Sequence, residues 1–352
     1  MRALVVANPA ATTTNTKVRD VLVDALGSQL KVDLAETTHR GHARELGAQA
    51  RADGVDVVVA LGGDGTVNEV VNGLLGRGPG ADVPTLAVVP GGSTNVFSRA
   101  LGRSRDPVEA TAEILDSLRA GRTRRVSLGT ASASGTSTAP LDPGIAPASA
   151  PAVAAADAAV HPGWTEPRWF VFAAGLGFDA EVISRVEAQR ARGRRSTGAL
   201  YVREATTAFL LGRDRRRPAV TVHVGEDVGP GTESARRSHA TNEVFLCLVS
   251  NVSPWTYLGA RPIDPSPEAS FDAGLDVFAL RRTGPLRMLG TLRRVMTPGA
   301  SATGRRVLSW HDLDELTLTA SRPQGWQLDG DHLGTATGLR LQSVPAALRV
   351  VA

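Results

Sequence analysis

The chain has 352 residues, of which 42% are hydrophobic and 21% are charged, and its formal net charge is +4. This length is sufficient for two domains with separate cores, and the composition is that of an ordinary soluble protein. The single cysteine, Cys247, excludes an internal disulfide and a cysteine zinc site. No apolar run of about 18 residues is present, so we expect no membrane-spanning segment. Because no signal peptide is recognisable, we expect a cytoplasmic protein.

The N-terminal third alternates between predicted strands and predicted helices. An apolar strand over residues 3–7 ends at Asn8-Pro9, and a helix follows whose inward positions run from Val18 to Leu26. A second strand over 32–36 leads to Thr37, and β-branched residues 55–59 predict a third, buried strand. A strand at 85–89 and a helix at 106–120 complete the pattern, which favours a parallel sheet with helices on both faces.

A glycine-rich motif follows the third predicted strand and precedes a helix. Its residues are Gly62, Gly63, Asp64, Gly65, Thr66, Val67 and Asn68. Glycines allow backbone N–H groups to approach an anion closely, and the helix contributes the positive end of its dipole. A carboxylate inside such a loop repels phosphate unless a metal ion or a hydroxyl group lies between them. We therefore predict a nucleotide site in which Asp64 acts through Mg²⁺ or a reacting hydroxyl, and Thr66 caps the helix or contacts the anion.

A second glycine-rich loop follows the strand at 85–89. It contains Gly92, Ser93 and Asn95, and it lies where an open α/β sheet binds phosphate or the acceptor substrate. An ordinary strand–turn–helix connection with a glycine-rich turn is the alternative interpretation for the first loop.

The two loops together resemble the signature of the diacylglycerol kinase catalytic-domain family, whose relatives include sphingosine kinases and NAD kinases. The similarity is strongest over 55–99 and weaker over 168–180 and 270–331. It implies ATP as phosphoryl donor, Mg²⁺ as cofactor, and nucleotide contacts from Asn8, Thr37, Ser93 and Asn95. Val96 occupies a position where the family usually has aspartate.

Three further segments, later in the chain, bear on function. Residues 175–179 resemble the family's Gly-x-Gly-Phe-Asp, which makes Asp179 the matching acid, and 329–331 resemble its Asp-Gly-Glu. The resemblance makes Asp331 the general base, with Asp329 as a supporting acid or as the alternative base. A turn at 272–276 resembles the family's structural Mg²⁺ site and implies Asp272 and Leu275 as ligands, although Ala273 replaces the second aspartate.

These patterns predict an α/β N-terminal domain with a parallel sheet, of the NAD kinase and diacylglycerol kinase type, and a mostly β C-terminal sandwich domain. We expect the nucleotide-binding domain at 1–127 and a β-rich lipid-substrate domain at 164–352, whose tail returns to the first domain. Residues 128–163 are dominated by Ala, Ser, Pro, Thr and Gly, which predicts a flexible insertion.

Ten arginines lie between residues 185 and 217, interspersed with apolar and aromatic residues. Such a mixture suits either an anionic lipid surface or a basic, solvated face. The arginines are Arg185, Arg190, Arg192, Arg194, Arg195, Arg203, Arg213, Arg215, Arg216 and Arg217.

We therefore expect an ATP-dependent kinase that phosphorylates a hydroxyl of diacylglycerol or a related lipid in a cleft between its domains. Its expected partners are the lipid substrate and an anionic membrane surface, without nucleic acid, and a homodimer is left open. The alternatives are a nucleotide- or lipid-binding regulator with weakened catalysis and an NAD kinase.

Overall fold

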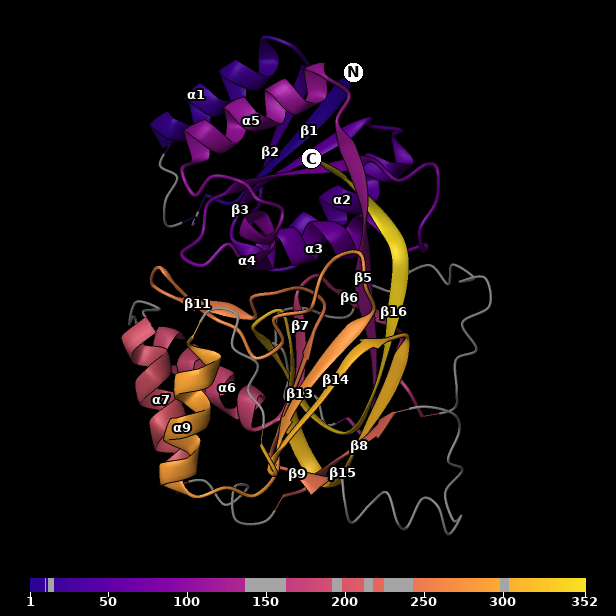
Figure 1. Ribbon diagram of the computed structural model, residues 1–352. Helices are drawn as coiled ribbons and strands as arrows, with labels where there is room; N and C mark the ends of the chain where they lie inside the picture. The colour runs from indigo at the N-terminus through magenta and orange to yellow at the C-terminus, as the bar shows by residue number, and fades with distance from the viewer. Residues whose placement is uncertain are drawn as a thin grey trace. The chain divides into compact units, whose positions relative to one another are not determined.

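The computed structural model describes residues 1–9, 11, 16–136, 163–191, 198–211, 218–224, 243–297 and 304–352. The chain divides into two compact units (Figure 1). Unit 1 comprises Met1–Leu128 and Pro345–Ala352, and unit 2 comprises Gly129–Val344. No helix in the described part of the chain is long and apolar enough to cross a membrane.

Unit 1 is built on a parallel sheet whose strands run in the order β4-β3-β1-β2, and the C-terminal end of β16 pairs with β4 at Val350 and Leu86. Its strands are β1 (Arg2–Ala7), β2 (Lys31–Glu36), β3 (Val57–Gly62), β4 (Thr85–Pro90) and the end of β16 (Asp331–Val351). Its helices are α1 (Thr16–Gly27), α2 (His42–Ala52), α3 (Asp64–Leu74), α4 (Val96–Ala100) and α5 (Pro107–Arg119).

Helices of unit 1 pack in two pairs. In Figure 1, α1 and α5 lie side by side, and their residues Leu22, Leu26 and Ile114 join the buried cluster that includes the strands. Helices α2 and α3 approach so closely that a Cβ on Gly73 would lie 2.1 Å from the carbonyl oxygen of Arg44. The parallel α/β fold predicted for the N-terminal part is confirmed.

Unit 2 is mostly antiparallel, with strands in the order β14-β13-β10-β7-β15-β16, as predicted for the C-terminal part. The strands on this path are β7 (Ala173–Gly177), β10 (Leu246–Ser250), β13 (Leu275–Leu280), β14 (Val307–Leu313), β15 (Glu315–Leu328) and β16. Further strands are β5 (Thr123–Ser134), β6 (Arg168–Phe170), β8 (Val220–Val224), β9 (Glu243–Val244), and the hairpin of β11 (Thr256–Leu258) and β12 (Arg261–Ile263).

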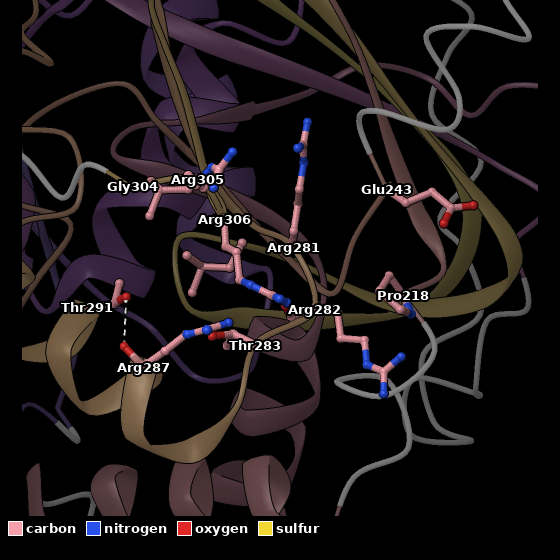
Figure 2. Close-up of a pocket in the computed structure, with 12 residues that line it drawn as sticks. Pro218, Glu243, Arg281, Arg282, Thr283, Arg287, Thr291, Gly304, Arg305 and Arg306 are labelled. Atoms are coloured by element: carbon pink, nitrogen blue, oxygen red, sulfur yellow. Dashed lines mark hydrogen bonds between the residues drawn. The ribbon is translucent and has the colours of Figure 1, made fainter.

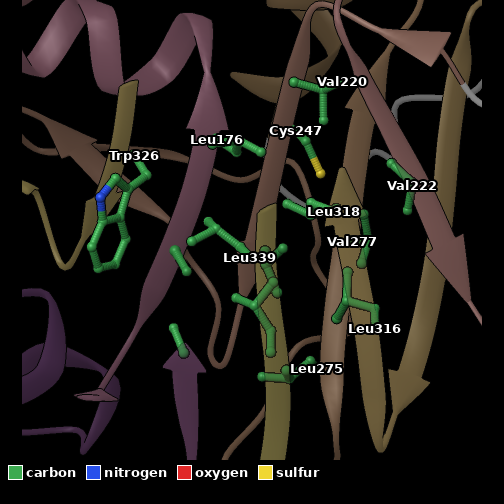
Figure 3. Close-up of a cluster of buried hydrophobic side chains, with 14 of the residues drawn as sticks. Leu176, Val220, Val222, Cys247, Leu275, Val277, Leu316, Leu318, Trp326 and Leu339 are labelled. Atoms are coloured by element: carbon green, nitrogen blue, oxygen red, sulfur yellow. The ribbon is translucent and has the colours of Figure 1, made fainter. Parts of the chain in front are cut away.

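Two buried clusters hold unit 2 together. One lies among the strands and includes Leu176, Cys247, Leu318 and Leu339 (Figure 3). The other is rich in phenylalanine and receives side chains from the helices α6 (Phe178–Ala191), α7 (Gly198–Leu211) and α9 (Pro285–Val295). The helices therefore join the sheet through aromatic packing around Phe178, Phe209 and Phe245, whose rings contact one another at centroid distances of 5.7–6.3 Å.

The predicted insertion at 128–163 begins too early. Strand β5 continues to Ser134, and its residues 129–131 pair with β6. Ala131 and Ala133 are buried in the strand cluster, so their small size reflects core packing in this segment. Residues 137–162 of the predicted insertion lie outside the described residues, as do most of the arginines between 192 and 217.

Candidate active site

The two glycine-rich loops of unit 1 pack backbone against backbone. The Gly91 N–H donates a hydrogen bond of 2.8 Å to the carbonyl oxygen of Gly62. A Cβ added to Gly91 would lie 2.8 Å from Gly62 Cα, and one added to Gly92 would lie 2.7 Å from Gly63 Cα. A side chain at either position would push the loops apart, so glycine is required there for close approach.

Helix α3 begins where these loops meet. Its N-cap is Gly63, whose backbone is extended, and no side chain caps the helix. Gly65 in the first turn is exposed, and so is Ser93 on the neighbouring loop. The first N–H groups of a helix lack intrahelical acceptors and favour anions. The exposed backbone at Gly65 can therefore bind a phosphate group.

Thr66 has a different role from the predicted cap. It is buried, and its hydroxyl accepts a hydrogen bond of 3.2 Å from the side-chain amide of Asn8. The capping prediction is wrong because the chain enters the helix one turn earlier, at Gly63. Asn8 and Thr66 thus tie the end of β1 to the first turn of α3.

Asp64 joins the two glycine loops. Its Oδ1 accepts a hydrogen bond of 3.2 Å from the backbone N–H of Phe97, in the first turn of α4. Burial raises the pKa of the Asp64 carboxyl to about 6, and the backbone N–H groups of Val96, Phe97 and Asn95 only partly offset that effect. The group therefore carries a charge at neutral pH that is poorly solvated and would be stabilised by a cation.

Three other predicted nucleotide residues shape the loops from inside. Asn95 has a left-handed backbone (φ 49°), and its side chain both accepts from the Gly92 N–H (2.9 Å) and donates to the Gly92 carbonyl (2.7 Å). Val67 and Asn68 are buried, and Asn68 accepts bonds from the Asn72 side chain. These contacts hold the loop geometry that exposes Gly65.

The loop that carries Thr37 lies before α2. Thr37 is partly buried, and the N–H of the next residue, Thr38, donates to His42 Nδ1 at 3.1 Å. Gly41, the N-cap of α2, donates its N–H to Glu69 Oε1 at 2.9 Å. Glu69 therefore connects α3 to this loop. Glu69 directly follows the glycine-rich motif in the sequence, but no local pattern identified Gly41 as its partner.

In unit 2, Asp329 is an anchor for the backbone. Its carboxylate accepts three hydrogen bonds of 2.7–3.0 Å from the N–H groups of Val171, Phe172 and Ala173. The residue is buried and adopts a left-handed backbone (φ 50°). A carboxylate with these donors holds the entry to β7 in place and cannot take a proton without weakening them.

Asp179 and Gln327 form a second buried pair. Gln327 Nε2 donates to Asp179 Oδ2 at 2.8 Å, and Gln327 Oε1 accepts from the Gly330 N–H at 2.9 Å. Burial raises the pKa of Asp179 to about 7, and the Gln327 bond partly offsets this rise. Gly175 leaves the necessary space, because a Cβ there would lie 2.8 Å from Asp179 Oδ2. Gln327 thus links Asp179 to the turn at Gly330.

Asp331 begins β16 immediately after that turn, where Gly330 has φ 82°. It is partly exposed, in contrast to Asp179 and Asp329, which are 5% and 6% exposed. The following residue, His332, donates its N–H to Glu187, and burial lowers the pKa of its imidazole. Sequence patterns did not single out Gln327 or His332, because their partners come from distant segments.

The two implied metal ligands differ in exposure. Asp272 is exposed, whereas Leu275 is buried in the pairing of β13 with β14. The neighbouring Gly274 N–H donates to Asp312, so the turn is held by the protein itself. Within the described ranges, no group of three or more His, Cys, Asp or Glu residues is arranged to hold a metal ion.

The predicted site residues fall into both units. Asn8, Thr37, Asp64 and the two glycine loops belong to unit 1, while Asp179, Asp329 and Asp331 belong to unit 2 together with the implied metal ligands.

Comparison with known proteins agrees with these motifs. Residues 2–131 match the family model of the diacylglycerol kinase catalytic domain. A diacylglycerol kinase of Bacillus subtilis (strain 168) is 46% identical over 77 residues, which are 22% of this chain and 24% of that protein. The sphingoid long-chain bases kinase 1 of Arabidopsis thaliana is 38% identical over 90 residues, or 24% of this chain and 12% of that protein. The matched segments thus span a quarter or less of these relatives.

The fold extends further than the sequence similarity. A crystal structure of a diacylglycerol kinase from Bacillus anthracis str. Sterne superimposes with a TM-score of 0.64 at 18% identity, covering 99% of this chain and 96% of that chain. This similarity shows a shared fold along nearly the whole chain.

Proposed function

We propose that this protein is an ATP-dependent lipid kinase, because residues 2–131 match the family model of the diacylglycerol kinase catalytic domain. It transfers the γ-phosphate to a hydroxyl of diacylglycerol or a related lipid. The two relatives named above act on a glycerolipid and on sphingoid bases according to their names, so the acceptor class is a lipid alcohol.

The observation that carries this proposal is the junction of the two glycine loops at the start of α3. The backbone there is compact, exposed at Gly65, and locked by the Asn95 and Asn8 side chains. Phosphoryl transfer depends mainly on positioning and on stabilising charge, which preformed backbone donors supply without reorganisation. The locked loops support a phosphate-binding role.

Mg²⁺ fits this site as a companion of the nucleotide. An ion bound by substrate phosphates needs only one or two protein carboxylates, and Asp64 supplies a desolvated one beside the exposed Gly65 backbone. When bound, the ion would neutralise charge on the phosphates. In the protein itself, the hydrogen bond from Phe97 to Asp64 connects the first turn of α4 to the first turn of α3.

We assign the acceptance of the hydroxyl proton to Asp331. A general base must reach its substrate, and Asp331 is the most accessible of the three candidate acids in unit 2. Asp329 keeps its three backbone donors and positions the turn, and Gln327 fixes the other side of that turn. Asp179 supports this arrangement from the buried side.

One assay tests the proposed function. The protein is incubated with γ-labelled ATP, Mg²⁺ and a panel containing short-chain diacylglycerol, sphingosine and NAD, and products are separated by chromatography. We expect a labelled lipid and no labelled NAD. Labelled NAD alone would make the protein an NAD kinase. ATP or lipid binding without any labelled product would make it a regulator.

A further inference from the structure

Helix α9 of unit 2 has one face in the protein and one face outside it. Val295 is buried in the phenylalanine-rich cluster, and Met288 packs against the same cluster. On the adjacent surface of the helix, Leu289 is 65% exposed and Leu292 is 41% exposed. These two leucines, three residues apart, form an apolar strip that the described protein leaves in contact with solvent.

A strongly basic pocket adjoins this helix. It has a volume of about 920 Å³, and the described residues that line it include five arginines, Arg281, Arg282, Arg287, Arg305 and Arg306, and one carboxylate, Glu243. Figure 2 shows that the arginines come from three segments: α9, the residues after β13, and the residues before β14. Three neighbouring segments of the chain, all between Arg281 and Arg306, thus gather positive charge in one place.

Within the described ranges, none of the five arginines that line the pocket forms an ion pair, and the buried Nε of Arg281 has no hydrogen-bond acceptor. Arg306 donates to the carbonyl oxygen of Arg282, which fixes one guanidinium at the pocket wall. Further charge lies at the end of α9, where Arg293 and Arg294 are exposed. The five pocket arginines, which form no ion pair with the described residues, favour an anionic ligand.

We propose that α9 and this pocket form a docking surface for an anionic phospholipid bilayer. Guanidinium groups bind lipid phosphates through paired hydrogen bonds, while exposed leucines beside them enter the acyl boundary. A nucleic acid or a free phosphate would satisfy the arginines but would offer nothing to Leu289 and Leu292. The combination therefore favours a membrane over other polyanions.

This surface deepens the proposed function, on which it rests, because a lipid kinase must reach a substrate that resides in a bilayer. It also adds a second candidate for the membrane contact. The sequence analysis offered the arginines between 185 and 217 either as a lipid-facing surface or as a basic, solvated face, and most of them lie outside the described residues. The α9 surface consists of other residues, so the two locations can be tested separately.

The test measures co-sedimentation with phosphatidylcholine vesicles that either contain or lack phosphatidylglycerol. Two double variants are compared with the wild type. The arginine pair combines Arg282→Ala with Arg287→Ala, and the leucine pair combines Leu289→Ala with Leu292→Ala. All four side chains are exposed, so melting temperature should not change. Leu34→Ala and Arg105→Ala in unit 1 are matched controls, since Leu34 is 41% exposed, the same as Leu292, and Arg105 is also exposed.

We expect wild-type protein to bind vesicles that contain phosphatidylglycerol, less at high salt, and to bind pure phosphatidylcholine poorly. The arginine pair should lose about thirtyfold in affinity, from about fivefold per arginine. The leucine pair should lose about tenfold. Both controls should bind as wild type does.

The proposal is overturned if wild type does not bind anionic vesicles, if both pairs bind like wild type, or if the controls lose as much. It is also overturned if the arginine pair loses inorganic phosphate binding while vesicle binding is unchanged. Turnover of soluble short-chain diacylglycerol separates the two proposals. Variants that bind anionic vesicles weakly but turn over soluble diacylglycerol at the wild-type rate support the docking surface. If the wild type binds anionic vesicles selectively but neither it nor any variant shows turnover, the kinase proposal is rejected and the docking surface is retained.

Discussion

Two carboxylates in this molecule use backbone N–H groups in opposite ways. Asp64 in unit 1 accepts a rather long hydrogen bond from Phe97, and burial raises its pKa to about 6. Asp329 in unit 2 accepts three shorter bonds and is surrounded by the backbone that it orders. The charged Asp64 carboxylate is destabilised by burial and would be stabilised by a cation. The Asp329 carboxylate is stabilised by hydrogen bonds from the protein itself. A sequence motif alone therefore does not tell which acid takes part in the reaction and which one has a structural role.

The largest effect that would sharpen this contrast is on turnover. Asp64→Asn should lower kcat by about 10³-fold or more, because it removes a charge that a cation beside the phosphates requires. The melting temperature should stay equal or rise, since an amide oxygen can still accept from Phe97 without burying a charge. Steady-state kinetics and thermal unfolding measure the two effects. Wild-type kcat in the folded variant would remove Asp64 from the chemistry.

Asp329→Asn should show the reverse pattern. Its amide group would present N–H to at least one of the three backbone donors, so the free energy of unfolding should fall by about 3 kcal/mol. Chemical denaturation measures this loss. Asp331→Asn is the matched control, because Asp331 is partly exposed and should change stability little. Equal stability of both variants would show that Asp329 is not an anchor.

The pH dependence of stability provides a third comparison. The folded-state pKa of Asp64, about 6, lies above the ordinary aspartate value of 3.8, so folding favours the protonated carboxyl. The loss of folding stability caused by the buried charge is absent below pH 3.8, grows between pH 3.8 and 6, and is complete above about pH 6. The free energy of unfolding of Asp64→Asn should therefore exceed that of the wild type by up to about 3 kcal/mol at pH 8 and should equal it at pH 3.5. A pH-independent difference would contradict the desolvation of Asp64.

The smallest predicted effect concerns the loop junction. Gly92→Ala should lower the free energy of unfolding by about 1–3 kcal/mol, since its Cβ would lie 2.7 Å from Gly63 Cα. Gly65→Ala is the control, because a Cβ there meets nothing within 4 Å. The control should keep its stability but raise the KM for ATP, because the methyl group covers the exposed backbone. An unchanged KM would place the phosphate elsewhere.

The contrast between the units also explains what the sequence could predict. In unit 1 the motif, its strand and its helix are contiguous, so residues 55–99 alone indicated a phosphate-binding loop. In unit 2, Asp329 meets Phe172 across 157 positions of sequence, and Gln327 meets Asp179 across 148. No local pattern encodes such pairings. The fold class was predictable because periodicity is local, whereas the roles of Asp329, Gln327 and His332 required the register of β15 with β7.

Amino-acid composition gave a wrong start for the predicted insertion, and it did not predict two helices of unit 2. Alanine-rich residues at the end of β5 resembled an insertion, although Ala131 and Ala133 fill a tightly packed core. Helices α7 and α9 were not predicted, and α9 carries the exposed Leu289 and Leu292. The arginines of the basic pocket all lie between residues 281 and 306, a stretch that the sequence analysis did not single out.

The most direct test of the account is the initial rate of γ-phosphate transfer from ATP to a soluble short-chain diacylglycerol or sphingosine, by wild type and Asp331→Asn side by side. Removal of a general base typically costs 10²- to 10⁴-fold. We predict labelled lipid from the wild type, a loss of about that size in kcat for the variant, and substantial activity in Asp331→Glu. ATP affinity should change little. A wild type that labels none of these lipids, or an Asp331→Asn variant as fast as wild type, would contradict the account.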